Sequence, residues 1–322
     1  MGTAAPTISV VTPTYKRPRL LERAVRSVRA QTLSEWELII SDDEDPPGET
    51  WQIAQRLAAD DGRIRAVRNP GPHGQSGNVN HAMRNARGRW VKPLYDDDAL
   101  HPACLEAFET VVRGRDSVAL VTCLLERFRD GAPVKRQERG ARPSLEMVEG
   151  RRALLGMYLQ DIDVGMPTQV MVRRSVIVEH GAFFEEVTGI LALVDSLWYA
   201  RVLRHGDLLF INRPLVEEHQ GAHATATSQT TEAMYDRELA RFRELLRDDV
   251  DASLNPPSPI VIDQQLRLIR AMHRLHIRRP VQAIRLAAGA WHPQAWYLAA
   301  RWLLRRRFPG RFYAVPRVPL DS

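Results

Sequence analysis

Cysteine is scarce in this sequence. Only Cys104 and Cys123 occur among its 322 residues. Two cysteines are too few for a disulfide framework, and neither stands beside the histidines or further cysteines that a structural zinc site needs. The sequence therefore argues against a small disulfide-stabilised secreted domain, and we expect a reducing compartment.

Long hydrophobic runs are missing as well. No segment approaches the ~20 apolar residues that span a membrane as a helix. The opening MGTAAPTISVV lacks the basic start and the apolar stretch of a signal peptide. Internal repeats and low-complexity tracts do not occur either. We expect a cytoplasmic protein, with a peripheral position at the inner face of the membrane as an open alternative.

The composition is that of a soluble globular protein, with 44% hydrophobic and 26% charged residues. The length exceeds the ~100 to 200 residues of a typical domain, which favours one large α/β domain with a C-terminal extension. The net charge is +6, and arginines concentrate after residue 260. This surplus suits nucleic acid, anionic lipid or a phosphate-bearing substrate, but no recognised nucleic-acid motif accompanies it.

Apolar runs alternate with helical periodicity in the first hundred residues. The patterns predict strands at 8–11, 36–40, 64–67 and 89–95, and helices at about 20–28, 50–59 and 75–87. Such alternation implies a parallel sheet with helices on both faces. The residues Thr12-Pro13-Thr14 are expected to form a loop that ends the first strand.

The middle of the chain is predicted to complete the same domain. Its patterns indicate strands at 118–123, 169–172 and 208–211, and helices at 151–159 and 194–205. Asn255-Pro256-Pro257-Ser258-Pro259 cannot continue a helix and therefore marks a linker, which a helical tail follows.

Polar clusters follow three of the predicted strands, at residues 12–15, 42–43 and 96–98. Ligands of open α/β sheets bind beyond the carboxyl ends of the strands, so one cleft could collect all three clusters. The run Asp96-Asp97-Asp98 would repel itself unless a divalent cation or hydrogen-bond donors offset its charge. Oxygen ligands of this kind favour Mg²⁺ or Mn²⁺. A solvated acidic turn that caps the next helix is the structural alternative.

Four segments in this order resemble the successive signatures of family 2 glycosyltransferases: ISVVTPTYKRPRLLERAVRSVRAQT, WELIISDDEDPPGET, SGNVNHAMRNARGRWV and LYDDDALHP. The resemblance covers about residues 7–225 and implies the GT-A fold, a Rossmann-like mixed α/β sheet flanked by helices. It implies a catalytic domain at 1–225, divided into a nucleotide-sugar-binding half at 1–115 and an acceptor-binding half at 116–225. Residues 226–322 would be a helical C-terminal extension.

The resemblance assigns donor-binding roles near the first two strands. Pro13 and Tyr15 would line the nucleoside pocket. Asp43 would accept a hydrogen bond from the base, and Arg17 would approach the diphosphate. Without the resemblance, Tyr15 could pack on the sheet edge, Arg17 could be a solvated helix start, and Asp43 could cap the next helix.

In the acidic turn, the resemblance gives the metal to Asp98, and the ribose or metal to Asp97 or Asp96. The unbroken run of aspartates leaves this register open by one residue. Asn80 would lie near the donor, although the arginine that precedes this asparagine in the family is Val79 here. One phosphate-neutralising charge must therefore come from elsewhere.

The general base is assigned to the segment TGILALVDSLW, in which Asp195 would take the proton of the acceptor hydroxyl. The acidic residue that often precedes this base is replaced by Val194, and an ordinary helix cap is the alternative for Asp195. Farther along, His219 and His223 are candidates for contact with the metal or diphosphate. Loop histidines without a ligand role are the alternative.

The implied activity is an inverting, metal-dependent transfer of a sugar from a UDP-, GDP- or dTDP-sugar to an unidentified acceptor hydroxyl, with Mn²⁺ or Mg²⁺ as cofactor. A nucleotidyltransferase of similar fold stays open, although its usual Gly-rich phosphate loop is missing after the first strand. A non-catalytic binder of sugar nucleotide or nucleic acid also stays open, but we expect no specific nucleic-acid partner. The basic C-terminal helices could rest on an anionic membrane surface, or they could pack against the catalytic domain or a second copy of the chain, and only their helical structure is predicted.

Overall fold

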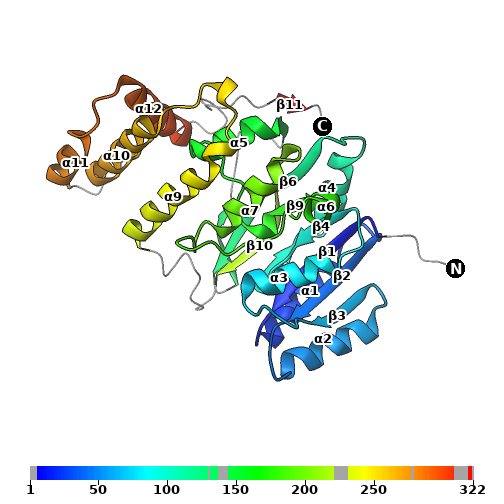
Figure 1. Cartoon of the computed structure of the whole chain (residues 1–322). Helices are drawn as coiled ribbons and strands as arrows, with labels where there is room; N and C mark the ends of the chain where they lie inside the picture. Colours follow the sequence, from blue (N-terminus) through cyan, green and yellow to red (C-terminus); the bar gives the residue numbers. More distant parts are fainter. Residues whose placement is uncertain are drawn as a thin grey trace.

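A mixed sheet of eleven strands forms the centre of the structure, a computed structural model that describes residues 6–129, 131–136, 144–220, 231–276, 279–307 and 318–320. Helices cover both faces of this sheet (Figure 1). The N-terminal half contains β1 Ile8–Thr14, α1 Pro18–Arg29, β2 Trp36–Asp42, α2 Glu49–Asp60, β3 Ile64–Arg68, α3 Gln75–Arg84 and β4 Trp90–Pro93. The predicted alternation of strands and helices in this half is confirmed.

Strands β1 to β4 are parallel, and β1 lies between β2 and β4. The expected loop at Thr12-Pro13-Thr14 is wrong, because these residues complete β1. The neighbouring β2 extends beside them as far as Asp42, which pairs with Thr14 and so continues the ladder. Strand β4 ends at Pro93, two residues before its predicted end. The carboxyl ends of these parallel strands meet at one edge of the sheet.

The second half of the sheet is partly antiparallel. It contains β5 Asp98–Leu100, α4 Cys104–Val112, β6 Val118–Arg129, β7 Ala132–Arg136, β8 Leu145–Val148, α5 Gly150–Tyr158, η1 Pro167–Gln169, β9 Val170–Arg173, α6 Arg174–Glu179, α7 Val194–Leu203 and β10 Asp207–Gln220. Strand β9 pairs antiparallel with both β4 and β6, whereas β6 and β10 are parallel. The parallel sheet predicted for the first hundred residues is confirmed by β1 to β4, and the complete sheet is mixed, as the resemblance implies.

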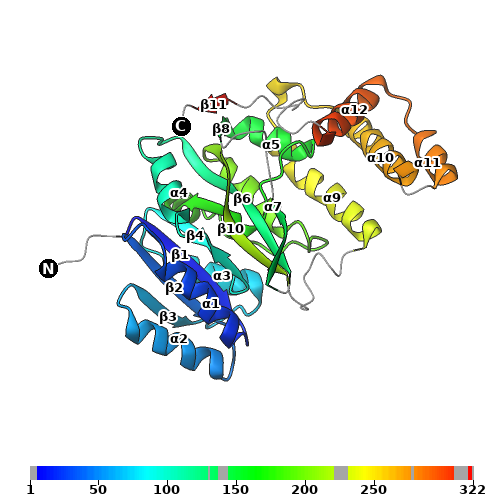
Figure 2. The same cartoon turned by 180° about the vertical axis from the view of Figure 1, so that it is seen from behind.

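The C-terminal part contains α9 Glu232–Leu246, η2 Arg247–Asp249, η3 Ala252–Leu254, α10 Pro259–His276, α11 Pro280–Ala287, α12 Pro293–Arg307 and β11 Val318–Leu320. Helix α9 packs on the body of the protein, while α10, α11 and α12 project beyond it (Figure 2). The expected helical C-terminal part is confirmed by α9 to α12, and it also includes a short strand, β11, which pairs with β8 at the end of the sheet order β11-β8-β10-β6-β9-β4-β1-β2-β3. The boundary expected at 225/226 lies outside the described residues.

Residues 255–258 of the predicted proline-rich linker join η3 to α10 without helix, and its last residue, Pro259, begins α10. None of the helices in the described part of the chain is long and apolar enough to cross a membrane.

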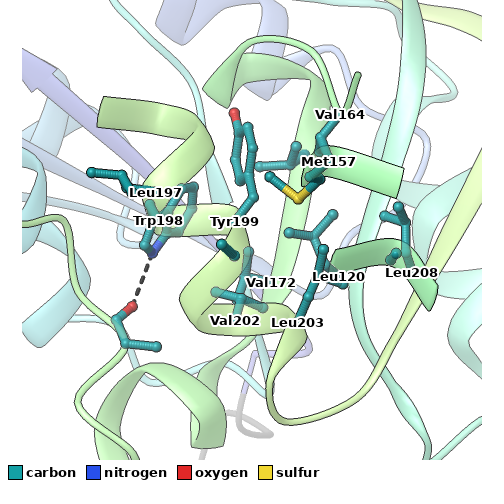
Figure 3. Packing of buried hydrophobic residues seen from close by; sticks show 14 of the residues in the cluster. Leu120, Met157, Val164, Val172, Leu197, Trp198, Tyr199, Val202, Leu203 and Leu208 are labelled. Carbon is teal, nitrogen blue, oxygen red and sulfur yellow. Dashed lines mark hydrogen bonds between the residues drawn. The ribbon is translucent and has the colours of Figure 1, made fainter. Parts of the chain in front are cut away.

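Two apolar clusters fill the two sides of the sheet, because successive side chains of a strand point to opposite faces. In one cluster Trp198 and Tyr199 of α7 are each 1% exposed and pack with Leu120 of β6 (Figure 3). The indole of Trp198 also donates a hydrogen bond of 2.9 Å to the carbonyl of Ala182. This packing anchors α7 on the sheet, and it thereby positions Asp195 in the first turn of that helix.

Candidate active site

The acidic turn joins β4 to β5 at the carboxyl edge of the sheet. Asp98 is the first residue of β5 and pairs with Glu218 of β10. Asp96 and Asp98 are only 3% and 4% exposed, and the next helix, α4, begins only at Cys104. Asp96 and Asp98 are therefore not solvated, and the turn does not cap a helix, so the structural alternative of a solvated capping turn does not fit these two aspartates.

The loop after β1 covers Asp96. Thr14 Oγ1 donates to Asp96 Oδ2 at 2.8 Å, and Arg17 Nη1 donates to Asp96 Oδ1 at 3.0 Å. Burial raises the pKa of Asp96, whereas both contacts oppose this rise. The same guanidinium lies 3.1 Å from Asp97 Oδ2, and the Asp97 side chain is one-third exposed. Arg23 of α1 donates to the Asp97 carbonyl, so two arginines of the first loop and helix hold the turn.

Asp98 is held by another segment of the chain, the short helix η1, which contains Thr168. Thr168 Oγ1 donates to its Oδ2 at 2.6 Å. Burial raises the pKa of Asp98 to about 7, and repulsion by the charges of Asp97 and Glu218 adds to the rise. Hydrogen bonds from Thr168 and from the backbone N–H of His219 act in the opposite direction. A cation bound beside this carboxyl would therefore strongly stabilise its charged form.

A lysine inside the sheet supports this arrangement. Lys92 of β4 is fully buried, and its ammonium donates to the carbonyls of Pro93 and Thr168. Burial lowers the pKa of Lys92. Lys92 and Thr168 were not identified from the sequence as part of the site. For Lys92 the one local indication is a lysine within an apolar run, and for Thr168 the sequence gives no indication.

Asp43 follows β2 and is 9% exposed. Its Oδ1 accepts from Asn69 Nδ2 at 2.6 Å and lies 3.0 Å from His73 Nδ1, and its Oδ2 accepts from the Gly74 backbone N–H at 2.7 Å. Asp43 thereby holds the loop between β3 and α3. The alternative of a cap on α2 does not fit, since that helix begins at Glu49 and shows no side-chain cap.

Pro13 and Tyr15 stand at the carboxyl end of β1. Pro13 is buried within the strand, whereas Tyr15 is 53% exposed just beyond it. Lys16 Nζ lies 5.1 Å from the centroid of the Tyr15 ring. Tyr15 is therefore not packed into the sheet edge, and its ring is accessible to a ligand.

Asn80 of α3 makes a two-fold contact with the backbone of Phe184. Its Nδ2 donates to the Phe184 carbonyl at 2.8 Å, and its Oδ1 accepts from the Phe184 N–H at 2.9 Å. The amide thus anchors the segment that leads to α7, and its donor-binding role stays a prediction. Two residues earlier, Asn78 Nδ2 donates to the Thr14 carbonyl at 3.1 Å, while Asn78 Oδ1 is buried without a hydrogen-bond partner.

Asp195 lies close to the acidic turn. Burial raises its pKa to about 7. The phenol pKa of Tyr95, at the start of the turn, is raised by burial and next by the charge of Asp195, with Asp97 and Asp98 contributing as well. Asp195, Asp97 and Asp98 thus all lie close enough to Tyr95 for their charges to act on the same phenol. Tyr199, one turn beyond Asp195, also feels its charge.

The segment before Asp195 is held by a buried glutamate that sequence reasoning missed. Glu238 of α9 is 5% exposed. Its Oε2 accepts the backbone N–H groups of Leu191, Ala192 and Leu193 at 2.9, 2.7 and 3.3 Å. Helix α9 therefore fixes the entry to α7, although it lies in the part of the chain expected to be a separate extension.

Of the two candidate histidines, the structure describes His219 but not His223. His219 lies on β10 beside the acidic turn, but its Nε2 is 3.1 Å from Glu217 Oε2, and its ring stacks on Phe128 with centroids 5.0 Å apart. His223 lies outside the described residues. A metal-ligand role for either one stays a prediction.

The residues of the acidic turn fit a hard divalent cation. Within the described ranges, no three His, Cys, Asp or Glu side chains could hold a metal ion by themselves. Mg²⁺ and Mn²⁺ do not need such a cage, since they bind one or two carboxylates together with waters and substrate phosphates. Asp98 and the partly exposed Asp97 provide carboxylates of this kind.

The chain resembles known glycosyltransferases in sequence. The model of the family described as "Glycosyl transferase family 2" matches residues 9–181. The chain is 33% identical over 123 residues to the GalNAc(5)-diNAcBac-PP-undecaprenol beta-1,3-glucosyltransferase of Campylobacter jejuni, covering 38% of this chain and 40% of that relative. It is 28% identical over 244 residues to an uncharacterized protein of Mycobacterium tuberculosis, covering 73% and 72%. The match thus spans less than half of the C. jejuni enzyme.

Solved structures share the fold. TarS residues 1–349 of S. aureus, in complex with UDP-GlcNAc, superpose with a TM-score of 0.61 at 13% identity, covering 88% of this chain and 91% of that one. The mannosyltransferase PcManGT of Pyrobaculum calidifontis, in complex with GDP-Man and Mn²⁺, gives 0.52 at 17% identity, covering 94% and 81%. At these identities the likeness establishes the fold alone, and it confirms the expected GT-A architecture.

Proposed function

The chain belongs to glycosyl transferase family 2, and we propose that it transfers a sugar from a nucleoside-diphosphate sugar to an acceptor hydroxyl, with inversion at the anomeric carbon and with Mg²⁺ or Mn²⁺. The observation that supports this most is the grouping of Asp195 and the acidic turn around Tyr95. A carboxyl that can accept a proton thus lies beside carboxylates that suit a cation and a diphosphate.

The donor is proposed to lie across the carboxyl ends of β1, β2 and β4. Tyr15 offers an exposed ring for the base, and Pro13 and Asp43 complete the nucleoside pocket. The two solved neighbours carry UDP-GlcNAc and GDP-Man, so a UDP-, GDP- or dTDP-sugar is the proposed donor class. Arg17 would face the diphosphate, and Asn80 of α3 stays a candidate for contact with the donor.

Asp195 is the proposed general base. As the acceptor oxygen forms its bond to the anomeric carbon, the bond from that carbon to the diphosphate oxygen breaks, and the hydroxyl proton passes to the Asp195 carboxylate. Attack from the face opposite the leaving group inverts the anomeric configuration. A pKa of about 7 suits this task, because a base works best when its pKa lies near the working pH.

The leaving diphosphate gains negative charge during the reaction. Arg17 can share its guanidinium between the aspartates and the diphosphate. A bound Mg²⁺ or Mn²⁺ would supply further positive charge to the phosphate oxygens. Asp98 and Asp97 would hold this ion, and Asp96, bound by Thr14, would hold the ribose or the ion.

A donor screen tests the proposal. UDP-, GDP- and dTDP-sugars are titrated by calorimetry with Mn²⁺, with Mg²⁺ and with chelator, and release of nucleoside diphosphate is followed in parallel. We expect one nucleotide class to bind with metal dependence and to be slowly hydrolysed. If no nucleotide sugar binds with or without metal, the proposal fails.

A further inference from the structure

The three helices α10, α11 and α12 form a strongly basic lobe. Residues 259–307 contain ten arginines, no lysine and a single acidic residue, Asp263. The remainder of the chain holds 35 basic and 38 acidic residues, a net charge of −3. All of the positive surplus of this protein therefore comes from one lobe, and the catalytic body is slightly acidic.

The same lobe exposes most of the large apolar side chains on the surface. Fourteen such side chains are exposed in the described part of the chain, and nine of them belong to this lobe: Ile260, Leu275, Val281, Ile284, Trp291, Trp296, Tyr297, Leu303 and Leu304. Isolated exposed apolar residues are ordinary, whereas a concentration of them marks an interaction surface.

The lobe has its own small core, formed by Val261, Leu268 and Leu298 together with alanines, and its remaining bulky residues lie outside this core. Small side chains such as Ala283, Ala295 and Ala299 are 3% exposed or less. On α11, Val281 and Ile284 lie one turn apart and are 61% and 68% exposed, so they share a face that leaves Ala283 inside. Helix α11 thus exposes its two β-branched side chains and buries an alanine, which is the reverse of a helix that buries its larger apolar residues.

Aromatic residues gather where α11 turns into α12. Trp291 is 71% exposed and Tyr297 is 58% exposed. Trp296 is 51% exposed although its Nε1 is fixed at 2.8 Å from the carbonyl of Ala290. Rings with an apolar body and a polar edge favour the boundary between lipid headgroups and acyl chains. The lobe stands away from the sheet, so a flat surface can reach it (Figures 1 and 2).

We propose that the lobe of α10, α11 and α12 docks the protein on a membrane surface rich in anionic phospholipid. Ile284, Trp291 and Tyr297 enter the headgroup boundary, while arginines such as Arg279 and Arg285 contact lipid phosphates. An anionic lipid surface attracts arginines through its negative charge, and its headgroup boundary accommodates exposed apolar side chains. Contact between two copies would instead bring two lobes of the same strong positive charge together, which opposes pairing.

Vesicle flotation of the full chain tests this surface without any donor or acceptor. Vesicles of phosphatidylcholine alone are compared with vesicles in which about one lipid in three is phosphatidylglycerol. We expect flotation with the anionic vesicles only, weakened by salt. The paired change Arg279→Glu and Arg285→Glu should lower the apparent affinity by at least about fivefold for each arginine.

A second pair tests the apolar part. Ile284→Glu with Trp291→Glu should lower vesicle affinity by about tenfold or more, because each buried apolar side chain contributes to insertion. Arg87→Glu and Val178→Glu are the matched controls, since both side chains are exposed on the catalytic body. Circular dichroism checks that each variant is folded.

Three results would overturn the proposal. Wild-type protein that stays in the bottom fraction of the gradient at low salt, apart from the floating vesicles, shows that no lipid surface is bound. Equal loss of binding in the lobe variants and in the body controls shows that any added negative charge suffices. A dimer in sedimentation velocity that dissociates on Ile284→Glu, without vesicle binding, assigns the surface to a second copy of the chain.

Discussion

Arg17 Nη1 lies 3.0 Å from Asp96 Oδ1 and 3.1 Å from Asp97 Oδ2. This one guanidinium joins the loop after β1 to the turn after β4, two segments about eighty residues apart in sequence. It also reduces the repulsion among the aspartates when no donor is bound. The residue expected to meet the diphosphate is therefore already placed by the acidic turn.

Replacing Arg17 should weaken donor binding even without metal. Arg17→Ala removes a charged hydrogen-bond donor, so we expect the affinity for the nucleoside diphosphate to fall about tenfold or more. Calorimetry in chelator measures this loss. Arg19→Ala is the matched control, because Arg19 is exposed on the first turn of α1. Unchanged affinity in Arg17→Ala would remove Arg17 from the donor site.

The metal site can be probed through Thr168, which hydrogen-bonds Asp98. Thr168→Val should lower Mn²⁺ affinity about 10- to 100-fold, as partners of metal ligands commonly do, and Asp98→Asn should abolish the metal-dependent part of donor binding. Electron paramagnetic resonance of Mn²⁺ with nucleoside diphosphate present gives the affinity.

Thr122→Val is the control for this pair. Its hydroxyl is also buried and donates to a backbone carbonyl, that of Val164, so it reports the effect of losing a buried threonine hydroxyl as such. Wild-type metal affinity in both Thr168→Val and Asp98→Asn would contradict the assignment of Asp98.

Asp195→Asn should slow sugar transfer by about 10²- to 10⁴-fold while donor affinity stays within about twofold. The amide cannot accept the proton, but it keeps the size of the side chain. Glu186→Gln is the control, because Glu186 is exposed in the loop before α7. Full activity in Asp195→Asn would show that another group is the base.

The pKa of Asp195, raised to about 7 by burial, predicts two pH dependences. Turnover should rise with pH up to about 7 and then level off, because only the carboxylate accepts a proton.

Between the ordinary carboxyl pKa of 3.8 and 7, the folded state holds more protons at this site than the unfolded state. Asp195 therefore makes the protein less stable as pH rises through this range.

Asp195→Asn should remove that contribution to stability. The free energy of unfolding of the variant, compared with wild type, should increase from pH 5 to pH 8 in urea titrations at matched salt. An unchanged difference across this range would show that Asp195 does not hold its proton in the folded protein.

Glu238 should affect catalysis through the position of α7. Glu238→Ala leaves three N–H groups without their acceptor, so we expect a loss of about 1 to 3 kcal/mol in the free energy of unfolding and a lower kcat with an unchanged Kd for the donor. Glu238→Gln keeps one acceptor oxygen and should restore part of kcat. Glu244→Ala, exposed on the same helix, is the control. Equal losses in kcat and donor affinity would indicate general unfolding instead.

Local sequence patterns predicted many of the elements, but they missed others, such as α4 and α6, and some limits. The predicted strand at 36–40 and helix at 50–59 recur as β2 and α2. The loop predicted at Thr12-Pro13-Thr14 was wrong. Proline lacks the N–H that strand pairing uses, but these three residues pair with β2 and continue β1. Strand β11 was missed, since three residues carry no periodicity and pair only with a distant β8.

The sequence by itself determined which polar residues follow the N-terminal strands, because the apolar runs fix the order of the strands to within a few residues and parallel strands share one carboxyl edge. It thereby brought Tyr15, Asp43 and the acidic turn into one candidate site.

Only the tertiary structure decided how that site is held. Asn80 binds Phe184 across 104 residues, Thr168 binds Asp98 across 70, and Glu238 binds the segment before Asp195 across about 45. No local pattern encodes these contacts, because they form where packing of the sheet and helices leaves buried polar groups that must find partners.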